Sequence, residues 1–195
     1  MFSQNNEEEV IVNYFGGVIG NLIDIGAYCA EDKSNTRQLI LNGWSAVLIE
    51  PSPKPFQNLL DVYRDNLNIT LINTAISPEP ITAGLVKWYD SNGDAISTMS
   101  EAHKAIWKDV PYRMYYCPVV HINSVYSAVG NANFDFINLD VEGMNYEILL
   151  TLNLEGCRCI CVEYGDKFNE VRNYLNGKGF TQTLLHNGEN LIMAR

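Results

Sequence analysis

The sequence has few positive charges for its length. Its 195 residues contain 13 Lys and Arg against 23 Asp and Glu, so the formal net charge at pH 7 is −10. No cluster of Lys and Arg offsets this charge. Proteins that bind a phosphate backbone depend on such clusters, so we expect no nucleic acid partner.

Long apolar runs are also missing. The first nine residues are mostly polar and acidic, and no run approaches the roughly 20 apolar residues that a membrane helix needs. We therefore expect neither a signal peptide nor a membrane span, and we predict a cytoplasmic protein. The five cysteines, an odd number without framework spacing, do not indicate a disulfide scaffold.

The glycines of a dinucleotide site are missing too. The stretch from Gly26 to Glu31 keeps only the first glycine of the pattern G-x-G-x-x-G. Glu31 and Asp32 stand where the next helix should begin, and negative charge there opposes a pyrophosphate. NAD is therefore disfavoured. A phosphate-free cofactor with net positive charge, such as S-adenosylmethionine, would find the same carboxylates favourable.

Residues 22–25, Leu-Ile-Asp-Ile, are typical of a short buried strand in a parallel sheet covered on both faces. An ionised Asp24 among apolar neighbours is costly without a partner, so we expect a donor or a cation near it. Gly26 permits a sharp turn and the close approach of a ligand. Ligands of open α/β sheets lie beyond the carboxyl ends of the strands, which favours a site here. The alternative is a buried strand followed by an ordinary glycine turn.

The rest of the chain alternates predicted helices and strands, which indicates a parallel sheet with right-handed crossovers. At 195 residues with 47% hydrophobic content, we expect a single domain over 1–195. Helices are predicted at 7–15, 33–41, 53–63, 101–108, 144–152 and 168–175. Further strands are predicted at 45–49, 69–72, 86–89, 114–121, 134–139, 158–162, 180–185 and 190–193. The last two, joined by Asn187-Gly188, should close the chain as an antiparallel hairpin.

Residues 78–121 interrupt this alternation and are rich in aromatic side chains. These aromatics can fill a small satellite core. An insertion between two strands of a nucleotide-binding fold can equally form the wall of a substrate pocket, and we assign it that role as a hypothesis.

The second predicted strand ends at Glu50. An acidic residue at this position can accept hydrogen bonds from both ribose hydroxyls of a nucleotide. Alternatively, the segment is a turn in which Ser52 caps a helix whose first residue is Pro53, and both descriptions can hold together. Residues 73–77 follow the third strand, where an adenine ring would lie.

These residues resemble the FkbM-type methyltransferase family over roughly residues 20 to 180. The matching segments are Asp24-Ile25-Gly26-Ala27, Ile49 to Pro53 with Phe56, Asn73 with Ala75-Ile76-Ser77, Ser97, Phe136 to Gly143, and Glu147-Ile148-Leu149. The family is similar to class I S-adenosylmethionine-dependent methyltransferases. The resemblance implies an α/β, Rossmann-like, doubly wound and mostly parallel seven-stranded sheet with a C-terminal antiparallel hairpin. Cys29-Ala30 and Asn138 depart from the family pattern.

The resemblance also implies roles for individual residues. It implies S-adenosylmethionine as the cofactor and a hydroxyl of a sugar or small metabolite as the acceptor. The cofactor-binding residues carried over are Asp24, Gly26, Ala27 and Tyr28 for the methionine part, Glu50 for the ribose, Asn73 and Ala75 for the adenine, and also Ser97 and Asp140. Asp140 and Glu142 would face the methyl group and the acceptor.

A hydroxyl is a poor nucleophile while it is protonated, so a base is expected. Asp140 and Glu142 are the first candidates by position, with His103 or His121 behind them. Alternatively, the two carboxylates only favour a helix N-terminus, or they bind a divalent metal, together with Glu163. We favour the shared cofactor and base role and assign no metal.

Two other function classes stay open. One is a non-catalytic nucleotide-binding module of the same fold, and the other is a different Rossmann-type nucleotide enzyme. Turnover and the preference between S-adenosylmethionine and NAD would separate them. The sequence predicts no oligomeric state.

Overall fold

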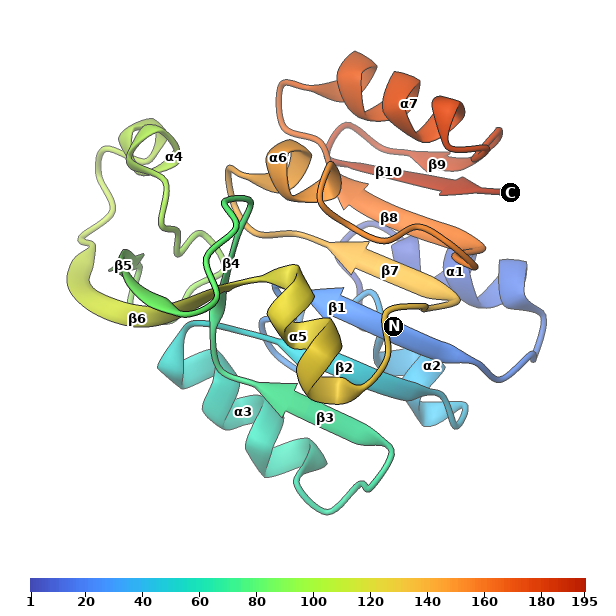
Figure 1. Ribbon diagram of the computed structural model, residues 1–195, viewed down its shortest axis with the longest axis horizontal. Helices are drawn as coiled ribbons and strands as arrows, with labels where there is room; N and C mark the ends of the chain where they lie inside the picture. The colour runs from blue at the N-terminus through green and yellow to red at the C-terminus, as the bar shows by residue number, and fades with distance from the viewer.

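The computed structural model describes residues 1–195 and contains two β-sheets (Figure 1). The larger sheet has seven strands in the order β3-β2-β1-β7-β8-β10-β9. Its strands are β1 Asn21–Ile25, β2 Ser45–Ile49, β3 Ile69–Ile72, β7 Phe136–Leu139, β8 Cys159–Glu163, β9 Gln182–His186 and β10 Asn190–Ala194. The first five of these are parallel, whereas β10 is antiparallel to both β8 and β9. The predicted fold class is therefore confirmed.

Helices cover both faces of this sheet and form two cores. Buried side chains of α1 Glu7–Phe15, α2 Arg37–Leu41 and α3 Pro53–Tyr63 pack on one face. Those of α5 Ile122–Val129, α6 Asn145–Leu149 and α7 Phe168–Gly177 pack on the other. In β1, Leu22 belongs to the first core and Ile23 to the second. Burial on both faces explains why the central strands are continuous apolar runs.

The smaller sheet contains three strands in the order β4-β6-β5. Its elements are β4 Ala75–Ser77, β5 Gly84–Asp90 and β6 Arg113–His121, with helix α4 Glu101–Ile106 between the last two strands. We call residues 75–121 the small lobe. Figure 1 shows this lobe beyond the ends to which the arrows of β1 and β7 point. It covers the predicted insertion and adds residues 75–77, which had been predicted only as a segment beside an adenine.

Several predicted helix boundaries are wrong. The helix predicted to begin at residue 33 begins at Arg37, because Lys33 has a φ of 57° and the preceding residues form an irregular loop. The helix predicted at 101–108 ends at Ile106, and the one predicted at 144–152 covers only Asn145–Leu149. Helix α5 was not predicted.

Ser52 is the N-cap residue of α3, as the alternative interpretation of this segment predicted, but it gives no side-chain cap. Ser52 precedes the helix, but its hydroxyl makes no cap hydrogen bond and instead accepts one from Trp88 Nε1 at 3.2 Å. Pro53 does occupy the first helical turn, as expected. No helix in the structure has the length and apolar character needed to cross a membrane.

Candidate active site

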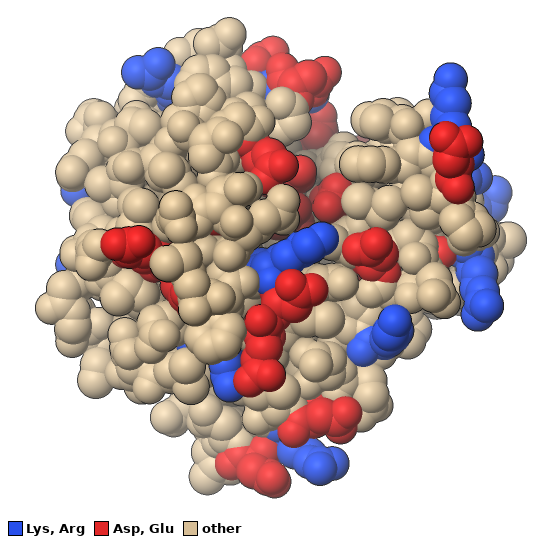
Figure 2. Space-filling model, turned by 180° about the vertical axis from the view of Figure 1, so that it is seen from behind, with Lys and Arg blue, Asp and Glu red and all other residues tan.

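A cavity of about 310 Å³ opens where the carboxyl ends of the central parallel strands face the small lobe. This volume is at the lower end of the range typical of small-molecule sites. Figure 2 shows acidic side chains gathered along the hollow between the main body and the smaller lobe. Lys33 is the only Lys or Arg among the lining residues. Eight lining residues are acidic, namely Glu7, Asp24, Glu50, Asp94, Asp140, Glu142, Glu163 and Glu189.

Asp24 lies at the end of β1 with both carboxylate oxygens engaged. It accepts hydrogen bonds from Thr36 Oγ1 at 2.7 Å and from Asn138 Nδ2 at 2.8 Å. Burial raises the pKa of Asp24 to about 6, and the two hydrogen bonds oppose this shift. The donor expected near this carboxylate is thus supplied by the protein itself. Sequence reasoning missed Thr36, which no local pattern connects with Asp24.

Gly26 allows two loops to meet. Its φ is 90°, and a Cβ at this position would lie 1.7 Å from the backbone oxygen of Asp140. The group that approaches Gly26 closely in the structure is the backbone of Asp140, and the predicted approach of a ligand stays a prediction. It brings the loop after β1 against the loop after β7, and both loops line the cavity.

Glu50 is held at the end of β2 by backbone amides. Its oxygens accept hydrogen bonds from the N–H groups of Tyr28 at 3.0 Å and Ser52 at 2.6 Å. The side chain is 5% exposed, and burial raises its pKa to about 7 against the effect of these amides. The Ser52 side chain also lies within hydrogen-bonding reach of this carboxylate. A carboxylate has about four lone-pair sites, so it keeps some capacity for a further donor such as a hydroxyl.

Of the predicted cofactor-binding residues Asn73, Ala75 and Ser97, only two line the cavity. Ala75 and Ser97 line the cavity, whereas Asn73 does not. Asn73 Nδ2 donates to the backbone oxygens of Glu50 at 2.7 Å and Pro51 at 3.2 Å, so this side chain shapes the loop after β2. Their contacts with a cofactor stay predictions.

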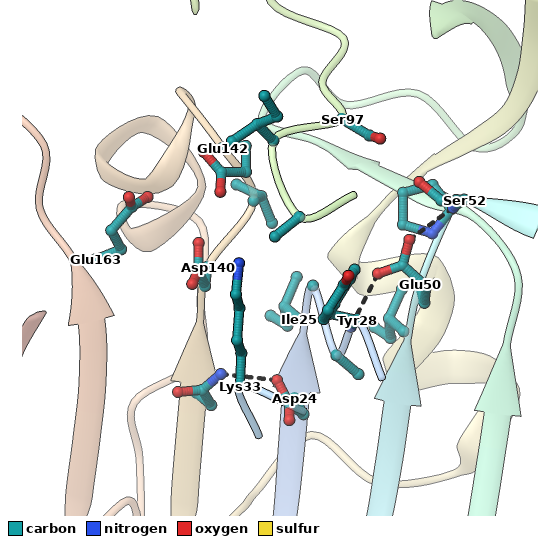
Figure 3. A pocket seen from close by; sticks show the side chains of 18 of the residues that line it. Asp24, Ile25, Tyr28, Lys33, Glu50, Ser52, Ser97, Asp140, Glu142 and Glu163 are labelled. Atoms are coloured by element: carbon teal, nitrogen blue, oxygen red, sulfur yellow. Dashed lines mark hydrogen bonds between the residues drawn. The ribbon is translucent and has the colours of Figure 1, made fainter. Parts of the chain in front are cut away.

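Asp140, Glu142 and Glu163 form what we call the carboxylate cluster. One oxygen from each lies within 4.8 Å of the others. Figure 3 shows the cluster at one side of the pocket and Glu50 at the other, with Tyr28 between them. Burial, together with the neighbouring carboxylates, raises the pKa of Asp140 well above its usual value and that of Glu163 to about 7. The predicted Asp140 and Glu142 are therefore brought together with Glu163.

His103 brings the small lobe to this cluster. Its Nε2 lies 2.9 Å from Glu142 Oε2, and this contact raises the pKa of His103. Gly143 makes the approach possible, because a Cβ there would lie 2.7 Å from His103 Cβ. His121, the other candidate, is outside the cavity lining and accepts a hydrogen bond from the backbone N–H of Asn123 at 3.2 Å.

Two buried side chains that sequence reasoning missed support the cluster. Asn145 Nδ2 donates to Glu163 Oε2 at 2.6 Å, while Asn145 Oδ1 accepts from the Val141 N–H at 2.7 Å. Thr98 Oγ1 donates to the backbone oxygen of Glu142 at 2.7 Å. In the sequence, each is only a polar residue in a segment without a recognisable motif, so sequence reasoning could not have identified its role.

A family model described as the methyltransferase FkbM domain matches residues 24–181. Among solved structures, a methyltransferase FkbM from Methylobacillus flagellatus KT has a TM-score of 0.57 and 13% identity to this chain. The match covers 90% of this chain and 43% of that protein, so this chain spans less than half of its length. At this identity the likeness shows the fold alone, and it agrees with a class I methyltransferase sheet.

Two more distant structures also match. A precorrin-6y C5,15-methyltransferase from Geobacter metallireducens GS-15 has a TM-score of 0.49 and 16% identity, covering 96% of this chain and 86% of that one. The putative methyltransferase yhhF from Escherichia coli has a TM-score of 0.48 and 14% identity, covering 100% and 88%. A comparison with curated proteins found no match.

Proposed function

We propose that this chain, which belongs to the methyltransferase FkbM domain family, transfers a methyl group from S-adenosylmethionine to a hydroxyl of a sugar or small metabolite. The family implies S-adenosylmethionine-dependent methyl transfer. The cofactor's place in the cavity, the hydroxyl and the acceptor class are the parts that we propose.

One observation carries the proposal most directly. Asp24, Glu50 and Asp140 come from the ends of three neighbouring strands and line one cavity, in which Lys33 is the only Lys or Arg. A cavity with this charge disfavours phosphates and favours a ligand with net positive charge. Bound S-adenosylmethionine supplies a methyl group on a positively charged sulfur. The acidic side chains present therefore fit this cofactor.

We assign the ends of the cavity different roles. Glu50 keeps lone-pair capacity for the ribose hydroxyls, because two backbone amides and the Ser52 side chain use only part of its roughly four sites. The carboxylate cluster and His103 form the opposite end, where the methyl group and the acceptor hydroxyl would meet. Alignment of the two reactants supplies much of the acceleration, up to about 7–11 kcal/mol in the best intramolecular systems.

His103 is the base that we propose for the hydroxyl proton, with Glu142 as its partner. The Glu142 carboxylate lies close to Nε2 and stabilises the protonated form of the ring. This assignment narrows the predicted set of Asp140, Glu142 and His103. Trp107 and Met99 of the small lobe also line the cavity and offer apolar surface to an acceptor.

Calorimetric titration with S-adenosylmethionine and with NAD tests the cofactor. We expect S-adenosylmethionine to bind and NAD not to bind. Glu50→Ala should weaken the binding of S-adenosylmethionine by about 1–3 kcal/mol, because hydrogen bonds to a charged group are lost. Glu79→Ala is the matched control, since Glu79 is exposed and outside the cavity. Binding of NAD alone would refute the proposal. Binding of S-adenosylmethionine without turnover on broad hydroxyl acceptor panels would favour a non-catalytic module.

A further inference from the structure

The carboxylate cluster holds more negative charge than the surrounding protein compensates. Asp140, Glu142 and Glu163 form no ion pair with any Lys or Arg, and only His103 meets one of them. Carboxylates that are brought together and removed from water need protons or cations to offset their repulsion. Something not supplied by the chain should therefore occupy this place when the groups are ionised.

A second observation concerns a single atom of the cluster. Asp140 Oδ1 is buried and has no hydrogen-bond partner in the protein. Asp140 is within hydrogen-bonding reach of Glu163, but two carboxyl groups can satisfy each other only by sharing a proton. Buried polar atoms are nearly always satisfied, so a carboxylate oxygen that has no N–H or O–H donor in the protein and lies in a cluster of three carboxylates indicates a place for a cation. We propose that the carboxylate cluster binds one oxygen-preferring divalent cation, of the Mg²⁺ and Mn²⁺ class.

The spacing of the three groups fits one ion. Oxygen ligands lie about 2.0–2.1 Å from Mg²⁺ and about 2.3–2.6 Å from larger cations such as Ca²⁺. Two oxygens on opposite sides of one ion are therefore about 4.0–5.2 Å apart. The cluster oxygens lie within 4.8 Å of one another, so one ion can reach all three with at most small side-chain rotations.

The surrounding contacts fix the direction of two of the ligands. Asn145 holds Glu163 Oε2, and His103 lies beside Glu142 Oε2. Such outer contacts orient ligand groups in metal sites. One face of the ion would remain open to the cavity, because the chain offers three carboxylates and an oxygen-preferring cation takes six or more ligands. A bound hydroxyl could occupy that face and would then lose its proton to His103 more easily.

This last role rests on the function proposed above, whereas metal binding itself does not. The test therefore uses chelator-treated protein without S-adenosylmethionine or an acceptor. Free Mn²⁺ is followed by electron paramagnetic resonance as it is titrated into the protein. We expect one site. Glu163→Gln should lower its Mn²⁺ affinity by about tenfold or more, because even the loss of an outer contact of a metal ligand costs about 10–100-fold in affinity.

Asp94→Asn is the matched control. Asp94 lines the same cavity, but its side chain is 61% exposed and it is outside the cluster. It should leave Mn²⁺ affinity unchanged. If both substitutions lowered the Mn²⁺ affinity equally, the binding would be a general attraction to an acidic surface, and the proposal would be overturned.

Thermal unfolding gives a second readout, because Glu163→Gln should change the unfolding temperature in opposite directions without and with Mn²⁺. At about pH 8, where Glu163 is mostly ionised, the metal-free Glu163→Gln variant should unfold at a higher temperature than the unsubstituted protein, because one repulsive charge is removed. With Mn²⁺ the unsubstituted protein should gain stability, and the variant should gain little. Absence of Mn²⁺ binding would mean that protons shared within the cluster explain its charge. The proposed methyl transfer would survive that result if S-adenosylmethionine still binds.

Discussion

Gly26 joins two loops that approach more closely than any side chain allows. We expect Gly26→Ala to lower the free energy of unfolding through two effects. The positive φ strains any residue with a Cβ, by about 1–3 kcal/mol. The Cβ also strikes the backbone oxygen of Asp140 at 1.7 Å, so the loops after β1 and β7 must separate.

Gly17→Ala separates the two effects. Gly17 has a φ of 85°, close to the 90° of Gly26, but nothing lies within 4 Å of an added Cβ. Urea unfolding should therefore show a much larger loss for Gly26→Ala than for Gly17→Ala. Equal losses would mean that the contact with Asp140 relaxes at little cost.

The pair of His103 and Glu142 makes a prediction that needs no acceptor. Because the Glu142 carboxylate raises the pKa of His103, Glu142→Gln should lower that pKa. The chain has only three histidines, so ring signals in an NMR titration are few, and His103→Gln identifies the right one. An unchanged pKa of His103 would show that the two side chains do not interact in solution.

The small lobe is attached to the site through Thr98 as well as His103. Thr98 is fully buried, donates to the backbone oxygen of Glu142 at 2.7 Å and accepts from the Ser100 N–H at 2.9 Å. Thr98→Val keeps the shape and leaves both backbone groups unpaired, at about 1–3 kcal/mol each. We expect faster hydrogen exchange in residues 98–100 and 141–143.

In the same exchange experiment β1 and β7 should stay protected, because the change is local to the junction between lobe and sheet. Thr82→Val is the control, since Thr82 is an exposed threonine of the same lobe. Unchanged exchange near Glu142 would show that the lobe does not depend on Thr98 for its position.

A helix or strand could be predicted where the residues that determine it lie close together in the sequence. The central strands and the final hairpin were predicted because their apolar runs and the Asn187-Gly188 turn lie within short windows. Helix α5 carried a readable signal that was not used, with Ile122, Val125 and Tyr126 at helical spacing. The pairing of β4 with β6 could not be read, since it joins Ala75 to Val119 across more than 40 residues.

The candidate site divides in the same way. Asp24, Glu50 and Asp140 could be found because each follows an apolar strand of a parallel sheet, and such strand ends meet at one edge. Their hydrogen-bond partners could not be found. Thr36 is the residue directly before α2, inside the segment that was predicted to be helical, and Asn145 begins a helix of only five residues. The position of these side chains depends on the packing of the whole molecule.

At the scale of the whole molecule, burial of acidic groups links stability to pH. Burial raises the pKa of Asp24 from 3.8 to about 6, and those of Glu50 and Glu163 from 4.5 to about 7. At a pH between the ordinary pKa of such a group and its raised pKa, the folded chain holds a proton that the unfolded chain has released. Stability therefore falls as pH rises through this window, which is the reverse of an acid held in a salt bridge.

Urea unfolding of the metal-free and cofactor-free protein between about pH 5 and pH 8 checks this prediction. One pKa unit corresponds to about 1.4 kcal/mol, so Glu50 alone can account for a loss of up to about 3 kcal/mol. Glu163→Gln should flatten the dependence, because its amide does not titrate. S-adenosylmethionine affinity should rise over the same range, since the ionised carboxylates suit a cationic ligand. A stability that increases with pH would show that these acids are already ionised and compensated in the folded protein.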